Sequence, residues 1–291
     1  MANTITNKKR IAWLPVVLAY LLSLLLVLVA IVGVVALTVC SPRFFKKQIE
    51  KSQFSTNVLS ELTENYLSYG VVGGFSAQVM ESLISADRIQ NDMYQTIDRL
   101  YDASMGEQSY ADLHQKSLDT FVADVKARNY SVTPEVEKGL VSLADACTLD
   151  YSSHVGVPFA SYLRSIFNKL QDNIWFPFAV LFLLSAVCVT LLLMNVHHTA
   201  ARLRYFTYAV SAASLLCLLV PILARGVVQM DRFNISPASL QKLLAQYVNA
   251  TFGTFLYFAV GYVILLGVLC FFASRKKQSS NSGQSGAKSS L

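Results

Sequence analysis

The chain has 291 residues, of which 54% are hydrophobic and 14% are charged, and its mean hydropathy is +0.44. This composition is typical of an integral membrane protein. The net charge of +6 is unevenly distributed, because residues 41–173 hold 17 of the 18 acidic residues but only 12 Lys and Arg, a formal charge of −5. The remaining basic residues mostly flank apolar segments, where they act as topology signals, and this placement excludes nucleic-acid binding.

The first apolar segment, residues 11–39, follows Lys8, Lys9 and Arg10 and is longer than a bilayer requires. It is also longer than the apolar region of a signal peptide, which has about 7–15 residues. The sequence Leu37-Thr38-Val39-Cys40 is similar to a lipoprotein cleavage site but has Val39 where that site needs a small residue. We therefore expect a retained transmembrane helix.

Three further apolar segments predict transmembrane helices at residues 174–196, 205–224 and 252–273. Three Lys and Arg lie in the N-terminal residues 1–10, two in the linker 197–204 and four in the tail 274–291, with no acidic residue among them. By the positive-inside tendency, both termini and the linker are cytoplasmic, whereas residues 41–173 and 225–251 are extracytoplasmic. We expect a multi-pass protein of a bacterial cell membrane, with a Ser/Gly-rich disordered tail.

The apolar spacing within residues 41–173 is helical, so the predicted fold is all-α: four transmembrane helices with an extracytoplasmic helical bundle between the first and second. The first bundle helix should continue from the first span and end at Gly70–Gly74. Further helices are expected at residues 75–103, 110–128, from Thr133-Pro134 onward, and at 159–170, the last leading into the second span. Its inward stripe is predicted to be Phe159, Tyr162, Ile166, Phe167 and Leu170.

The loop 225–251 contains a short helical pattern after Ser236-Pro237, with Leu240, Leu243, Leu244 and Tyr247 on one face. We expect this helix to lie at the membrane surface or against the bundle.

Cys40 and Cys147 are the two cysteines outside the predicted spans, in a compartment that permits disulfides. A bridge between them is one possibility and two free thiols are the other, since sequence spacing does not indicate proximity. Cys188, Cys217 and Cys270 are expected to be small apolar side chains within spans.

Two apolar features are candidate contact surfaces. Val71, Val72 and Phe75 adjoin the glycines at 70–74, which form either a plain turn or a loop that touches lipid or a partner. Ala209, Ala213 and Cys217 form a small-residue stripe in the third span, suited to packing among the four helices or against a partner subunit.

The sequence has no motif that indicates catalysis, a cofactor or a metal site. His197-His198 are adjacent and point apart on a helix, so they do not form a chelating pair. Ser152-Ser153-His154 is not evidence of a triad, because triads are assembled in space. The spans contain no Asp, Glu, Lys or Arg, which argues against a self-contained ion-coupled transporter.

The hypothesis that fits these patterns is a non-enzymatic membrane protein whose extracytoplasmic domain senses, scaffolds or recruits a partner protein. An alternative is a permease-like subunit, because one span, a large outer domain and three further spans resemble the layout of mechanotransmission-type ABC permeases. The resemblance implies an ATPase partner, although the linker 197–204 is short for an ATPase-coupling helix.

Overall fold

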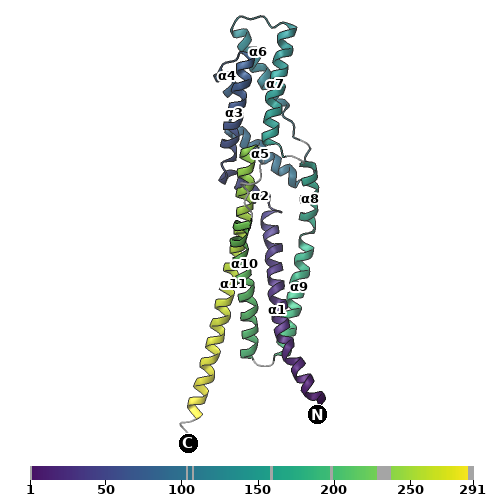
Figure 1. Cartoon of the computed structure of the whole chain (residues 1–291), viewed down its shortest axis with the longest axis vertical. Helices are drawn as coiled ribbons and strands as arrows, with labels where there is room; N and C mark the ends of the chain where they lie inside the picture. The colour runs from purple at the N-terminus through teal and green to yellow at the C-terminus, as the bar shows by residue number, and fades with distance from the viewer. Residues whose placement is uncertain are drawn as a thin grey trace. The chain divides into compact units, whose positions relative to one another are not determined.

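A computed structural model describes residues 2–102, 104–106, 108–157, 160–196, 199–227 and 237–287, and every regular element among them is a helix. This confirms the all-α prediction. The chain divides into two compact units. Unit 1 comprises Met1–Thr38, Asn173–Gln229 and Asn249–Leu291, and unit 2 comprises Val39–Asp172 and Met230–Val248. Figure 1 labels the eleven helices of the described residues.

Unit 1 is built from α1 (Ala2–Thr38), α9 (Trp175–Asn195), α10 (Thr199–Val227) and the larger part of α11 (Ala238–Ala287). Helix α1 packs against both α9 and α10. The buried side chains form two small clusters, one around Leu22 and Leu192 and one around Ala30 and Ala259. A hydrogen bond also joins two of these helices: Tyr262 Oη of α11 donates to the Leu26 carbonyl of α1 at 2.8 Å, as expected for a polar group in an apolar environment.

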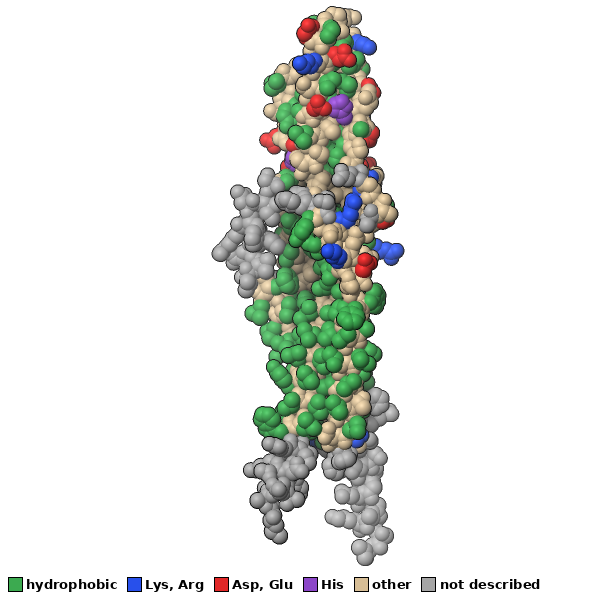
Figure 2. Space-filling model, turned by 90° about the vertical axis from the view of Figure 1, so that its right-hand side faces the viewer, with side chains coloured by type: hydrophobic (Ala, Val, Ile, Leu, Met, Phe, Trp, Pro, Cys, Tyr) green, Lys and Arg blue, Asp and Glu red, His purple; other side chains and the backbone are tan. Residues whose placement is uncertain are grey.

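Four helices are long and apolar enough to cross a membrane, which confirms the predicted number of spans. The apolar stretches are Trp13–Thr38, Tyr162–Asn195, Thr199–Ala224 and Ala238–Phe271. Two of them have 34 residues, whereas about 20 suffice for a bilayer, so their first turns extend beyond a hydrocarbon core. In Figure 2 the visible face of unit 1 is almost entirely hydrophobic, as lipid contact requires, whereas charged side chains gather on unit 2.

Unit 2 contains seven complete helices in its described residues and the first turns of α11. The helices are α2 (Pro42–Lys51), α3 (Phe54–Gly73), α4 (Ala77–Glu81), α5 (Ala86–Tyr101), α6 (Ala111–Ala127), α7 (Pro134–Val155) and α8 (Ala160–Asn173). Helix α3 packs against α4, α5 and α7, and α6 packs along α7. Their facing stripes form one core, in which Phe54, Tyr66, Phe121 and Tyr151 are fully buried.

Local capping divides two of the predicted bundle helices. Helix α1 ends at Thr38 and does not continue into the bundle, because Ser41 accepts the Phe44 N–H and Pro42 begins α2. Gln53, in the left-handed conformation at φ 52°, separates α2 from α3. The helix predicted over 75–103 is two helices, because Ser85 caps α5 by accepting the Arg88 N–H.

The start of α7 and the connection of α8 to α9 agree with the sequence prediction. Thr133 Oγ1 accepts the Val136 N–H, and α7 starts at Pro134. One residue, Ile174, with helical φ and ψ, separates α8 from α9. The inward stripe of α8 was predicted correctly at Phe167, which packs against the core and stacks on Tyr101 at 5.1 Å. It was wrong at Tyr162 and Ile166, which are exposed, and it omitted Leu163, which packs against the core. Phe159 lies outside the described residues.

The helical pattern predicted in the loop 225–251 is the beginning of α11. It packs within unit 2: Leu243 is fully buried in the core, and the Tyr247 ring lies 4.9 Å from that of Phe45. This supports docking against the bundle, one of the two expected positions. Ser236 lies outside the described residues. Helix α11 continues without a break to Ala287, so the predicted disordered tail is helical as far as that residue.

Candidate functional site

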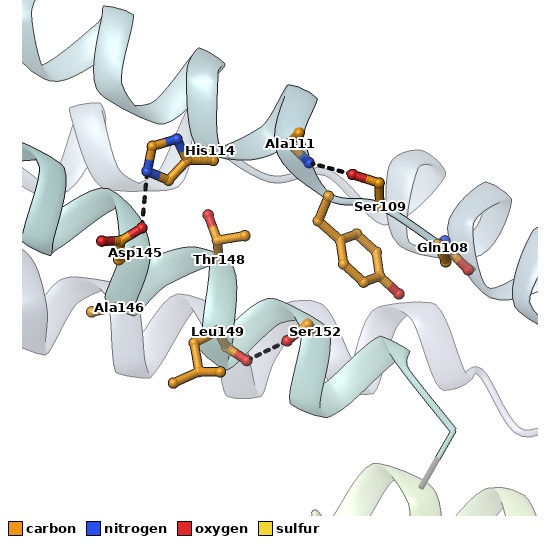
Figure 3. Close-up of a pocket in the computed structure, with 10 residues that line it drawn as sticks. Gln108, Ser109, Ala111, His114, Asp145, Ala146, Thr148, Leu149 and Ser152 are labelled. Carbon is orange, nitrogen blue, oxygen red and sulfur yellow. Dashed lines mark hydrogen bonds and ion pairs between the residues drawn. The ribbon is translucent and has the colours of Figure 1, made fainter. Parts of the chain in front are cut away.

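An open groove of about 650 Å³ lies between the start of α6 and the middle of α7 (Figure 3). It is lined by Gln108, Ser109, Tyr110, Ala111, His114, Asp145, Ala146, Thr148, Leu149 and Ser152. Leu149 is 72% exposed, a large value for an apolar side chain within a helix. Exposed leucines are common singly, but this one adjoins a concave surface with both polar and apolar lining.

A contact between a histidine and a carboxylate crosses one end of the groove. His114 Nε2 on α6 lies 3.0 Å from Asp145 Oδ1 on α7. The hydroxyls nearby are engaged by their own helix, since Thr148 donates to the Ala144 carbonyl and Ser152 donates to the Leu149 carbonyl. A nucleophile needs a base within hydrogen-bond reach, and the hydrogen bonds of these hydroxyls do not provide one.

A partly buried polar network joins α6 and α7, the two helices that line the groove, to α5. Tyr151 Oη donates to Asp92 Oδ2 at 2.7 Å, and the Arg88 guanidinium pairs with both Asp92 and Asp112. Burial is the main cause that raises the pKa of Tyr151, and the hydrogen bond to Asp92 raises it further. The network links α5, α6 and α7, so its hydrogen bonds hold the groove walls in position.

A second polar cluster joins three helices of unit 2. His154 Nε2 on α7 lies 3.8 Å from Glu61 Oε2 on α3, and its Nδ1 lies 3.4 Å from Asp150 Oδ1. Glu61 also accepts hydrogen bonds from Ser239 at the start of α11. The i, i+4 spacing of Asp150 and His154 is visible in the sequence. The Ser239 partner is 178 residues from Glu61, and no sequence signal indicates that contact.

The Ser152-Ser153-His154 sequence does not form a catalytic arrangement. The Ser153 hydroxyl donates to the Asp150 carbonyl at 2.7 Å, and His154 Nδ1 lies 2.9 Å from the same oxygen. A carbonyl only accepts, so His154 Nδ1 carries a hydrogen and is not free to take the serine proton. Among the described residues, no group of three His, Cys, Asp or Glu side chains is placed to hold a metal ion. His197 and His198 lie outside those residues.

Of the two possibilities for Cys40 and Cys147, the structure has the free thiols and not the bridge. Cys147 is fully buried, and the Tyr66 hydroxyl donates to its carbonyl at 2.7 Å. Cys40 is partly exposed and follows Val39, whose carbonyl accepts from Tyr101. The two residues therefore have different neighbours: Cys147, on α7, contacts α3, whereas Cys40 lies beside the end of α5.

Val71 and Val72 are 82% and 89% exposed, but they lie on the last turn of α3 and not in a loop. The helix continues past Gly70 and ends where Gly74 adopts φ 73°, with the Phe75 N–H donating to the Gly70 carbonyl at 2.8 Å. Phe75 was predicted incorrectly as part of a contact loop, because it packs against Phe121 with ring centroids 4.7 Å apart.

The stripe of Ala209, Ala213 and Cys217 is buried within unit 1. Ala209 packs in the cluster around Leu22 of α1 and Leu192 of α9, and Cys217 packs with Ala30 of α1 and Ala259 of α11. These small side chains allow close approach of neighbouring helices. The contacts support packing among the four helices of this chain, one of the two expected uses.

Comparison of the chain with protein-family models, with curated proteins and with solved structures gives no match. The functional argument therefore rests on the geometry and charge described above.

Proposed function

We propose that this chain is a non-enzymatic multi-pass protein of a bacterial cell membrane, and that unit 2 is its extracytoplasmic part, which recruits or senses a partner protein. One observation carries the proposal: all 18 acidic residues of the sequence belong to unit 2, whereas unit 1 has ten Lys and Arg and no acidic residue. Unit 2 also has 14 Lys and Arg, giving a formal charge of −4. By the positive-inside tendency, this segregation favours cytoplasmic termini and an outer unit 2.

The groove between α6 and α7 is the proposed contact surface. Leu149 offers an apolar anchor, and the surrounding Gln108, Ser109 and Asp145 offer hydrogen-bonding groups around it. Protein interfaces combine a buried apolar centre with a polar rim in this way. The bilayer is the second partner, in contact with the apolar outer surface of unit 1.

Sidedness is tested by cysteine labelling in a background with Cys40→Ala and Cys270→Ala, which removes the two cysteines that are not buried. Ser104 of unit 2 is exposed, so S104C in intact cells should react with a membrane-impermeant maleimide. S280C in the tail should react only after the cells are opened. Labelling of S104C only from the cytoplasmic side would refute the proposed orientation.

The contact surface is tested by replacing Leu149 with a photoreactive phenylalanine analogue in cells. The same analogue at Val72 is the matched control, because Val72 is also an exposed apolar residue of unit 2 but lies at the end of α3. A discrete adduct from position 149 alone supports the groove as the contact surface. An adduct from position 72 alone indicates that the partner binds at Val71 and Val72 instead. Absence of adducts at both positions would refute partner binding by these surfaces. Co-purification of an ATPase with the full-length chain would instead favour the permease-like alternative.

A further inference from the structure

The ring of His154 lies between carboxylates from two helices. Its Nε2 faces Glu61 Oε2 at 3.8 Å and its Nδ1 faces Asp150 Oδ1 at 3.4 Å. The side chain of His154 is 11% exposed, that of Asp150 is 13% exposed and that of Glu61 is 28% exposed. Charges in such a setting are less screened by water than surface charges are, so the charge on this ring affects the packing of α3 and α7.

The hydrogen-bond partners fix the tautomer of the neutral ring. Nδ1 lies 2.9 Å from the Asp150 carbonyl oxygen, which only accepts, so Nδ1 carries the hydrogen. In the neutral ring, Nε2 then presents a lone pair to the Glu61 carboxylate, and two acceptors face each other. In the protonated ring, Nε2 carries a hydrogen and shares a positive charge 3.8 Å from the Glu61 carboxylate, so the repulsive contact becomes an ion-pair attraction.

Glu61 is also the residue that attaches the start of α11 to unit 2. Its Oε1 accepts the backbone N–H of Ser239 at 2.9 Å, and its Oε2 accepts the Ser239 hydroxyl at 2.8 Å. The same Oε2 faces His154. This carboxylate caps free amide groups in the first turn of α11, where the helix dipole also favours a negative charge. Interactions that position the Glu61 carboxylate therefore also stabilise the first turn of α11 on α3.

The other polar groups of the cluster keep this geometry. On α3, Asn65 donates to Asp150 Oδ2 at 3.0 Å, which leaves Oδ1 facing the His154 ring. Burial and then the charge of Asp150 raise the pKa of Tyr69, so Tyr69 stays neutral. On α7, Ser153 Oγ lies 3.3 Å from His154 Nδ1. On α11, Lys242 Nζ donates to Asn57 of α3 at 3.3 Å, one turn from Ser239 and one turn from Glu61.

We propose that His154 is the proton-binding residue of a latch that holds the first turn of α11 on α3 and α7. Histidine side chains change charge between about pH 5 and 8. The protonated ring attracts both Glu61 and Asp150, so the attachment of α11 is strongest below that range and weakens as the pH rises through it. This inference rests on the proposed function in one respect: the proposed orientation of unit 2 decides which compartment sets the pH at His154.

The test measures hydrogen exchange of the α11 amides from Ser239 to Val248 in the full-length protein in lipid nanodiscs, at pH 5.5 and pH 7.5. Rates are corrected for the intrinsic pH dependence of exchange. We expect protection of these amides to be roughly two- to fivefold higher at pH 5.5, the scale of one ion pair in a partly exposed site. His154→Gln and Glu61→Gln should each abolish this difference.

His114→Gln is the matched control, because His114 also pairs with a carboxylate in unit 2 but does not contact the α11 attachment. It should retain the difference in protection. The proposal is overturned by equal protection at both pH values in the unaltered protein, by a difference that survives His154→Gln, or by a loss in His114→Gln as large as in His154→Gln. If His154→Gln does not fold, Glu61→Gln supplies the same comparison. The measurement does not depend on sidedness, so failure of the proposed orientation and failure of the latch are distinguishable.

Discussion

Glu61 of α3 accepts two hydrogen bonds from Ser239 of α11, one from its backbone amide and one from its hydroxyl, although the residues are 178 positions apart. A side-chain cap of this kind from another helix satisfies amide groups that the first turn of α11 leaves free. The contact joins the C-terminal part of unit 2 to the helices formed by residues 39–172.

Removing this cap should release the start of α11. Glu61→Ala should reduce the protection of the Ser239 and Leu240 amides by an amount corresponding to about 1–2 kcal/mol, the usual cost of losing a helix cap. Hydrogen exchange measures it directly. Glu64→Ala is the matched control, because Glu64 is an exposed residue one turn along the same helix. If both variants lowered protection equally, the effect would come from the charge of α3 and not from the cap.

Gly70 is required by the close approach of α4 to α3. A Cβ at Gly70 would lie 2.6 Å from Met80 Cγ, and Met80 is fully buried. Gly70→Ala should therefore lower the free energy of unfolding by about 1–3 kcal/mol through overpacking. Gly139→Ala should instead raise it by up to about 1 kcal/mol, because Gly139 is exposed within α7 and a Cβ there meets nothing within 4 Å. Chemical denaturation of the two variants measures the predicted opposite signs.

Cys147 should be unreactive in the folded protein. Burial raises its pKa to about 12, with a smaller contribution from Asp150, so at pH 9 only about one thiol in a thousand is ionised. The thiolate is the reactive form, so maleimide should label Cys40 first and Cys147 only after denaturation. Mass spectrometry of peptides labelled under native conditions checks this order. A peptide linking Cys40 and Cys147 under non-reducing conditions would contradict the free thiols of the structure.

Gly33 of α1 should be sensitive to substitution because Phe258 of α11 packs against it. A Cβ at Gly33 would lie 2.5 Å from the tip of the Phe258 ring. Gly33→Ala should lower the melting temperature in detergent, since a partly buried aromatic ring must move. Gly261→Ala, on α11 where a Cβ meets nothing within 4 Å, should leave it within about 1 °C. Equal losses in the two variants would show that the contact with Phe258 is not the cause of the loss.

The spans and most bundle helices could be predicted because their signals are local. Thr133-Pro134 indicates the start of α7. The apolar segment of residues 11–39 is longer than the apolar segments of helices in soluble proteins. The breaks at Gln53 and Ser85 were missed, because a run with helical spacing on both sides hides a single capping residue. The inner face of α8 was predicted only in part for another reason: Ile166 is as apolar as Leu163, so hydrophobicity alone does not separate them, and the tertiary contact of Phe167 with Tyr101 selects the inner face.

The cluster formed by Glu61, His154 and Ser239 could not be predicted from the sequence. Glu61, His154 and Ser239 carry no motif, and their meeting depends on the docking of α11 through Leu243 and Tyr247. The sequence identified the apolar face of that helix but not the polar contacts beside it, because hydrophobic periodicity indicates which face is buried and not against which partner.

The burial of Ala209, Ala213 and Cys217 has a consequence for self-association in a bilayer. The stripe that would let two α10 helices approach closely is already covered by α1 and α11. The part of α10 that remains outward carries branched side chains, namely Leu215, Leu219, Ile222 and Leu223. A second copy meeting this surface would be held at the 8–10 Å axis separation that leucine side chains impose, so an oligomer formed through α10 would lack the tight backbone contact of small-residue helix pairs.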